Sequence, residues 1–177
     1  MTQTSMKLTV TTPNDLHIVM TRVFDAPRRL VWDAMTKPGL VRKWLFAPPD
    51  WKMTVCKGDV RPGGTFRWQW AGPDGKAALM IHGTYHEVVS PERIVHTEMM
   101  EMGPGAAGCG SPCEDAEPST VLVTLELDEQ GGQTHMKMTI ACPTKEVRDA
   151  MLASGMDQGM EAGYQQLDAI LAQQVRH

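Results

Sequence analysis

The chain has 177 residues, of which 42% are hydrophobic and 21% charged, and its formal net charge is −4. This length favours one domain with a sizeable core, and the negative charge disfavours nucleic acid as a partner, because basic surfaces bind phosphate backbones. No apolar run is long enough for membrane insertion. The first residues do not resemble a signal peptide, so we expect a cytoplasmic protein.

The first quarter of the chain predicts a strand followed by two short helices. Residues 1–15 are polar, and we expect them to form a flexible N-terminus. Residues 16–24 alternate between apolar and polar side chains, which is typical of a strand. Asp25 is a helix-capping residue type, and the apolar positions after it predict one short helix that ends near Lys37. A second short helix is predicted over about 38–44.

The middle of the chain predicts six further strands. Phe66, Trp68 and Trp70 alternate with polar residues and therefore share one face of a strand. Turn residues such as those of Gly72–Gly75 separate the segments. Because short turns join antiparallel neighbours, we expect one antiparallel sheet. The predicted strands are residues 51–55, 65–70, 77–89, 94–102, 121–127 and 134–140.

Residues 103–118 are rich in Gly, Ala and Pro without periodicity, which predicts a flexible loop. The loop contains Cys109 and Cys113. This thiol pair could form a disulfide, bind a soft metal or respond to oxidants, or it could have no role. The four cysteines of the chain are irregularly spaced and do not indicate a disulfide framework.

The C-terminal part predicts one long amphipathic helix over residues 143–174. Pro143 suits a first helical residue, because the N–H group that proline lacks has no partner there. The helix would be about 45 Å long. Three glycines spaced by four suggest a close approach of the sheet or room for a ligand. The apolar and small stripe consists of Met156, Met160, Gly163, Leu167, Ile170 and Leu171.

Strands followed by a long amphipathic helix indicate an α+β fold with the helix against the sheet. A sheet of six to seven strands twists and curls, and a curled sheet around a helix leaves a space that suits a small apolar ligand. We therefore expect residues 16–174 to form a single domain with such a space.

Short motifs follow one another along almost the whole chain: Ile18–Pro27, Val31–Ala34, Trp44, Asp59–Phe66, Pro73–Gly75, Gly83–Tyr85, Ser90–Val95 and Gly155–Met160 with Tyr164 and Leu167. In this order and spacing they resemble the SRPBCC superfamily, which is START-like and similar to the birch-pollen allergen. The branch that they resemble is that of the heat-shock-protein-ninety ATPase activator homologues. The resemblance implies a helix-grip (START-like) fold, whose cavity in relatives holds lipids, sterols or other hydrophobic molecules. Leu45–Phe46 and the 103–118 loop depart from the usual pattern.

The favoured hypothesis is that a small hydrophobic or aromatic, lipid-like molecule binds between the C-terminal helix and the sheet, without a cofactor. The fold implies that inward aromatic and methionine side chains line either the core or the cavity. The predicted cavity residues are Phe66, Trp68, Trp70, Tyr85, Met136, Met138, Met156, Met160 and Leu167.

Two other hypotheses stay open. One is an enzyme of cyclase or hydrolase type that uses a carboxylate, such as Glu87 or Glu98, or a histidine in the same cavity. The other is a chaperone-cofactor-like domain that binds protein, and a homodimer is a further hypothesis. No metal site is predicted, because the spacing of the histidines matches no metal motif. His82, His86, His96 and His135 are expected to be ordinary surface side chains.

Overall fold

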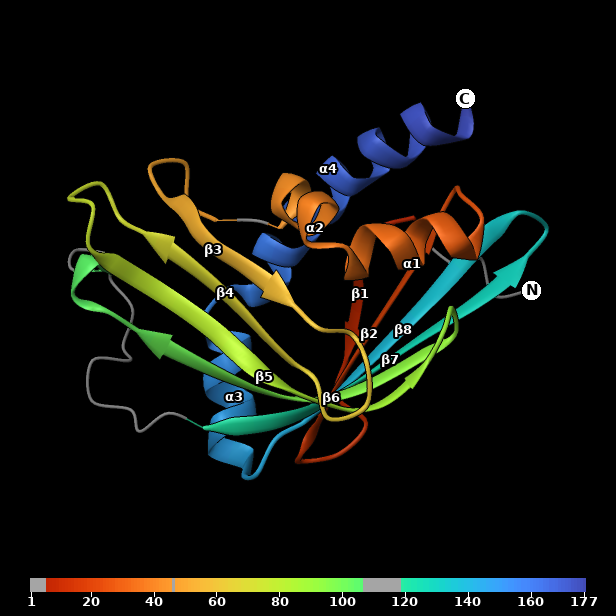
Figure 1. The fold of residues 1–177 in the computed structure, drawn as a ribbon. Coiled ribbons are helices and arrows are strands. Elements are labelled where there is room, and N and C mark those ends of the chain that lie inside the picture. The colour runs from red at the N-terminus through yellow and green to blue at the C-terminus, as the bar shows by residue number, and fades with distance from the viewer. Residues whose placement is uncertain (1–5, 46, 107–118) are drawn as a thin grey trace.

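The computed structural model describes residues 6–45, 47–106 and 119–177. In this part of the chain, an eight-stranded antiparallel sheet is combined with four α-helices and one short 3₁₀ helix (Figure 1). The elements are β1 (Thr9–Thr11), β2 (His17–Phe24), α1 (Arg28–Thr36), α2 (Pro38–Trp44), β3 (Lys52–Gly58), β4 (Thr65–Ala71), β5 (Ala77–Val89), β6 (Arg93–Met102), η1 (Pro104–Ala106), β7 (Thr120–Gln130), β8 (Gln133–Ala141), α3 (Lys145–Ala153) and α4 (Met156–Val175).

The strand order is β1-β2-β8-β7-β6-β5-β4-β3, and every neighbouring pair is antiparallel. The predicted α+β fold with one antiparallel sheet is confirmed, as are the two short helices after the first predicted strand. Both helices contact α4, and Figure 1 shows them beside its upper part. The sheet is strongly twisted, so its two ends diverge.

The predicted count of six to seven strands is wrong, because β1 adds a strand in the polar N-terminal segment. Thr9 of β1 pairs with Thr21 of β2, and the Leu8 backbone N–H donates to Glu161 Oε2 of α4 at 2.9 Å. These contacts order a stretch of the segment 1–15 that was expected to be flexible. Residues 1–5 lie outside the described residues.

The predicted single C-terminal helix is also wrong, because α3 and α4 are separate helices. Gly155, at φ +76°, has a left-handed conformation that interrupts the helical path and precedes the first residue of α4. The start differs from the prediction as well. Thr144 is the N-cap of α3, and its Oγ1 accepts a hydrogen bond from Val147 N at 3.2 Å.

The larger of two hydrophobic clusters joins α1, α2 and α4 to the sheet. Tyr164 of α4 lies at its centre and is 1% exposed. Its ring stacks on Trp44 of α2 with the centroids 5.6 Å apart, and Phe24 of β2 meets it edge-on at 5.5 Å. These contacts fix α4 against β2 and α2.

The smaller cluster lies between the sheet and the α3–α4 region. Ile18, Val123 and Ile140 are buried there, and Met151 of α3 and Met156 of α4 pack against them. We call the side of the sheet that carries these residues the inner face, and the opposite side the outer face. None of the residues of α3 is fully buried, so this helix covers the inner face only loosely.

A buried ion pair fixes α4 to the inner face. The side chain of Arg22 is 1% exposed and donates to both carboxylate oxygens of Asp168, at 2.9 and 2.7 Å. Its Nε donates to Glu161 Oε2 at 3.2 Å. Burial opposes the charge of Arg22, but the hydrogen bonds to the two carboxylates outweigh it and raise its pKa.

The predicted flexible loop at residues 103–118 begins with the helix η1 at Pro104–Ala106, so this part is not an irregular segment as expected. Gly105 approaches the Lys76 and Ala77 backbone so closely that a Cβ atom at this position would collide with it. Cys109 and Cys113 lie outside the described residues, and the hypotheses about them stay predictions.

Candidate functional site

The register of the sheet assigns side chains to its two faces, because directly opposed residues of an antiparallel pair point to the same side. Trp68 of β4 is opposite Ile81 of β5, which is opposite Met100 of β6. Further along β6, His96 is opposite Val123, a residue of the smaller cluster. Alternation along β6 therefore places all these residues on the inner face.

The inner face is covered in one half and partly open in the other. Around β2, β8 and β7 it is sealed: Ile18 and Met20 have no exposed surface. Around β4, β5 and β6, Trp68 and Ile81 are only partly buried, and Met100 is 48% exposed. The half over β4–β6 thus presents apolar side chains on the side of the sheet where a core is expected.

An aromatic cluster lies in this open half. The ring of Phe66 is 4.8 Å from that of Trp68, 5.3 Å from Tyr85 and 5.1 Å from His96, measured between centroids. Gly83 is opposite Phe66 in the register. A Cβ at Gly83 would collide with the Thr97 carbonyl oxygen and approach Phe66 Cε1 at 2.8 Å, so glycine is required under this ring.

His96 and Glu98 form a polar pair beside the aromatic cluster. His96 Nε2 lies 3.3 Å from Glu98 Oε2, and the side chains are 12% and 23% exposed. His96 Nδ1 is buried and has no hydrogen-bond partner among the described residues. The tautomer with its proton on Nε2 fits these surroundings, since it donates to Glu98 and leaves no donor at Nδ1.

Tyr85 completes the polar part of the site. Burial, together with the negative charges of Glu98 and Asp59, raises the pKa of Tyr85 to about 12. Its hydroxyl therefore stays protonated around neutral pH. The open half of the inner face combines aromatic rings, a phenol and a carboxylate that a histidine orients.

The structure brings together only some of the predicted cavity residues. Phe66, Trp68 and Tyr85 lie in the aromatic cluster. Trp70 is 2% exposed and belongs to neither hydrophobic cluster. The remaining predicted residues lie on β8 and the α4 side: Met136 and Leu167 are buried in the larger cluster, Met138 and Met160 pack against both clusters, and Met156 packs against the smaller one.

Two expectations about polar residues need correction. His96 is not an ordinary surface side chain, because it is 12% exposed and lies among aromatic rings. Glu87 is a half-exposed partner of Arg93, whose Nε donates to it at 3.1 Å, and so it is not part of the site. Glu98 remains as the carboxylate on the inner face.

Sequence reasoning missed both His96 and Arg22 as inward residues, although a signal for each exists. His96 is in phase with Ile94 on β6, and Arg22 is in phase with Ile18 and Met20 on β2. A charged or titratable residue at an inward position of an alternating strand indicates a buried partner.

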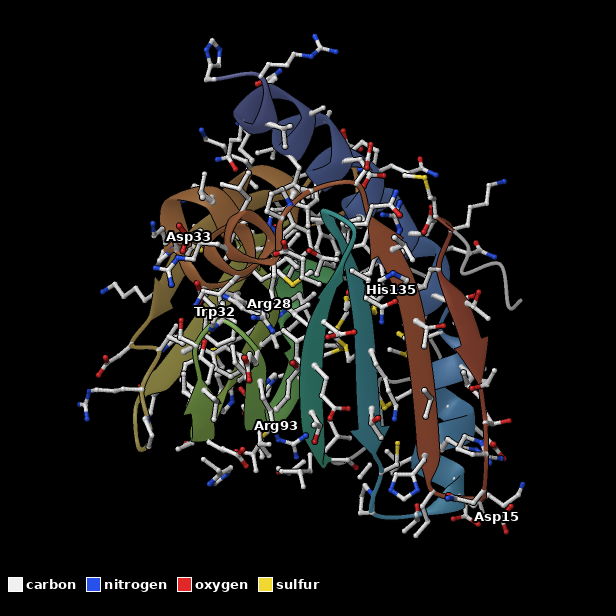
Figure 2. All side chains as sticks on the ribbon, turned by 90° about the vertical axis from the view of Figure 1, so that its right-hand side faces the viewer. Asp15, Arg28, Trp32, Asp33, Arg93 and His135 are labelled. Atoms are coloured by element: carbon white, nitrogen blue, oxygen red, sulfur yellow. The ribbon has the colours of Figure 1, made fainter. Side chains whose placement is uncertain are left out.

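Among the described residues, the outer face includes a pair of shallow hollows lined mainly by polar and charged side chains. One lies near Arg28, Arg93 and His135 in Figure 2, on the side of the strands that faces the viewer. Arg93 there pairs with Glu126 at 2.8 Å. The other hollow lies around His82 and Glu101. Neither lies between α4 and the sheet, so a cavity at that position stays a prediction.

The described residues contain no group of three or more His, Cys, Asp or Glu side chains that could hold a metal ion. No helix in this part of the chain is long and apolar enough to cross a membrane.

Residues 25–172 match the family model described as "Activator of Hsp90 ATPase homolog 1-like protein". The chain belongs to this family. The resemblance to SRPBCC proteins is thereby confirmed. A search of curated protein sequences finds no match to the chain.

Solved structures of similar proteins share the fold over nearly the whole chain. A crystal structure of a Rhodobacter sphaeroides protein has 32% sequence identity and a TM-score of 0.80, with 94% of this chain and 98% of that one covered. Protein Ms6760 from Mycobacterium smegmatis has 24% identity and a TM-score of 0.75, with 94% and 99% covered. A Staphylococcus epidermidis protein solved by NMR has 26% identity and a TM-score of 0.71, with 96% of both chains covered.

Proposed function

We propose that the protein binds a small hydrophobic or aromatic molecule on the inner face of the sheet, over β4–β6. The observation that carries the proposal is the row Trp68, Ile81 and Met100, whose apolar side chains are not sealed although they face inward. Removing apolar surface from water stabilises a complex by about 25 cal/mol per Å². An apolar ligand would cover this row.

The adjacent helices support the same location. α3 has no fully buried residue, and its partly buried Met151 borders the smaller cluster. The thioether side chains of Met138 and Met160, also partly buried, pack against both clusters. Methionine is flexible and polarizable, so it adapts to ligands of irregular shape. These three methionines therefore provide adaptable apolar surface beside the smaller cluster.

The fluorescent probe N-phenyl-1-naphthylamine tests the proposal, because its emission rises when it enters an apolar site. Wild-type protein should bind the probe at a single saturable site. Trp68→Ala and Met100→Ala should each weaken binding by about tenfold, which corresponds to the loss of part of the apolar contact.

Leu122→Ala is the matched control for Met100→Ala. Leu122 is 42% exposed, but its register with Thr97 places it on the outer face. This variant should bind the probe as the wild type does. Equal losses in Met100→Ala and Leu122→Ala, or no saturable binding at all, would contradict the proposal.

For the enzyme hypothesis, the geometry of the His96–Glu98 pair favours Glu98 over His96 as the group that acts on a substrate. Nε2 of His96 is engaged by Glu98, and Nδ1 is buried, so no nitrogen of this ring is free to reach a substrate. Glu98 is left as the group that could accept a proton. Hydrolysis of p-nitrophenyl butyrate that Glu98→Gln abolishes would support this second candidate, and equal rates in both proteins would remove it.

A further inference from the structure

We propose that Glu98 is an anchor for an organic cation, so that the ligand is an amine or ammonium group on an apolar or aromatic body. This inference rests on the proposed function and adds the chemical class of the ligand. It is argued from the charge of the inner face, the orientation of the carboxylate and the rings around it.

The first step is the charge of Glu98. Among the described residues, no lysine or arginine pairs with it, and its polar partner is His96. The residues outside the described part contain no lysine or arginine in their sequence. A partly buried carboxylate without a counter-ion attracts a cation more strongly than an exposed one, because water screens it less.

The second step concerns Arg22, the one lysine or arginine that the described strands place on the inner face. Arg22 is held by Asp168 in a bidentate pair and by Glu161 through Nε. The single positive charge of Arg22 is thus matched by two carboxylates, those of Asp168 and Glu161. No positive charge of this cluster is left for Glu98. With one positive and two negative groups, the Arg22 cluster has a net negative charge, which disfavours an anionic ligand beside it.

The third step is the role of His96. With its proton on Nε2, the ring donates to Glu98 Oε2 and orients the carboxylate without cancelling its charge. The buried Nδ1 has no acceptor in the described residues, which favours the form with no proton there. His96 is thus a positioning residue, and Glu98 is the group that meets the ligand.

The fourth step is the set of rings beside the carboxylate. The register between β5 and β6, in which His82 is opposite Met99 and Tyr85 is opposite His96, places Glu98 opposite Gly83. Phe66 lies over Gly83, and Trp68 lies 4.8 Å from Phe66 and is partly exposed. Aromatic faces attract organic cations, so rings next to a carboxylate favour an ammonium group.

The outer face provides a control carboxylate on the same strand as Glu98, namely Glu101 of β6, which pairs with His82 of β5. His82 Nε2 lies 3.3 Å from Glu101 Oε1, the same distance as in the inner pair, but the side chains are 36% and 38% exposed. No ring contact involves His82 in the described residues. Glu101→Gln therefore removes an equivalent carboxylate from a different setting.

The experiment compares three probes that share one body: 4-phenylbutylamine, 4-phenylbutan-1-ol and 4-phenylbutyrate. Each displaces N-phenyl-1-naphthylamine from the wild type at about pH 7, where the amine is positive and the acid negative. The amine should bind about tenfold more tightly than the alcohol, and the carboxylate should bind weakest. In Glu98→Gln the amine should lose this advantage while the affinity for the alcohol stays the same.

Glu101→Gln should leave all three affinities unchanged, and Glu98→Asp, which keeps the charge, should retain part of the preference for the amine. Equal affinities for amine and alcohol in the wild type would overturn the inference while the proposed function stands. A preference for the amine that survives in Glu98→Gln would also overturn it. If the naphthylamine and all three probes fail to bind, the proposed function fails, and this inference fails with it.

Discussion

The two faces of the sheet carry the same pair of residue types in different surroundings. His96 and Glu98 lie on the inner face among aromatic rings, whereas His82 and Glu101 lie on the outer face beside solvent. The distance between nitrogen and oxygen is 3.3 Å in both. The pairs differ in placement, because the inner one lies along β6 and the outer one joins β5 to β6, and they differ in burial. Burial places the inner carboxylate, held by His96, next to apolar surface.

The largest effect on the free energy of unfolding is expected at Gly83, where the inner face has no space for an added methyl group. Gly83→Ala would press a methyl group against the Thr97 carbonyl and the Phe66 ring, so we expect a loss of about 2–4 kcal/mol in the free energy of unfolding. Urea denaturation measures it. Gly39→Ala is the control, because a Cβ there meets nothing within 4 Å. A loss below that of the control would mean that the aromatic cluster is not rigid.

The next effect compares an inner arginine with an outer one. Arg22→Met removes a buried guanidinium that two carboxylates of α4 require, and we expect a loss of about 1–3 kcal/mol. Arg93→Met removes a 38% exposed guanidinium that pairs with Glu87 and Glu126, so the loss should be below about 1 kcal/mol. Thermal unfolding of both variants checks the order, and the reverse order would contradict the assignment of the faces.

A third effect is the pH dependence of the inner ion pair. Burial alone would raise the pKa of Glu161, but the hydrogen bonds that its carboxylate accepts from Arg22, Leu8 N and Gln165 outweigh burial and hold the pKa below the ordinary value of a glutamate. A carboxyl group with a lowered pKa stabilises the folded state above its unfolded pKa and loses this contribution as the pH falls. The melting temperature should therefore fall between about pH 5 and pH 3, and less steeply in Arg22→Met. Parallel pH curves for the two proteins would argue against this contribution.

The smallest effect concerns the two glutamates without ligand. Glu98→Gln and Glu101→Gln each keep an oxygen that can accept from the neighbouring histidine, so each should change the free energy of unfolding by less than about 0.5 kcal/mol. Differential scanning calorimetry of both variants provides the values. A large loss in Glu98→Gln alone would assign Glu98 a structural role instead of a binding role.

Much of the fold could be predicted because periodicity is local. Alternation in β4 and β6 and the helical stripe of the C-terminal part were sufficient for the α+β class and the antiparallel sheet. β1 was missed although Leu8 and Val10 alternate with polar residues, because the strand has only three residues and a distant residue, Glu161, helps to hold the segment. The break at Gly155 could not be predicted either, because glycine adopts negative and positive φ about equally readily, and the sequence does not show which one a given glycine has.

The candidate site could be predicted only in part. The alternation of side chains along a strand correctly identifies Trp68 and Tyr85 as inner-face residues. The same alternation also places His96 and Arg22 on the inner face. Alternation along a strand does not show whether an inward residue fills the core or borders a ligand. Leu167 and Trp68 both face inward, but only the packing of α4 seals the first and leaves the second partly open.

Methyl NMR of methionine tests the central claim most directly, because methionines lie on both faces of the same strands. Met100 is on the inner face, whereas Met80 and Met99 are on the outer face, opposite Glu101 and His82. We predict that N-phenyl-1-naphthylamine shifts the methyl signals of Met100 and Met138 and leaves those of Met80 and Met99 in place. Shifts confined to the outer-face methionines would contradict the account.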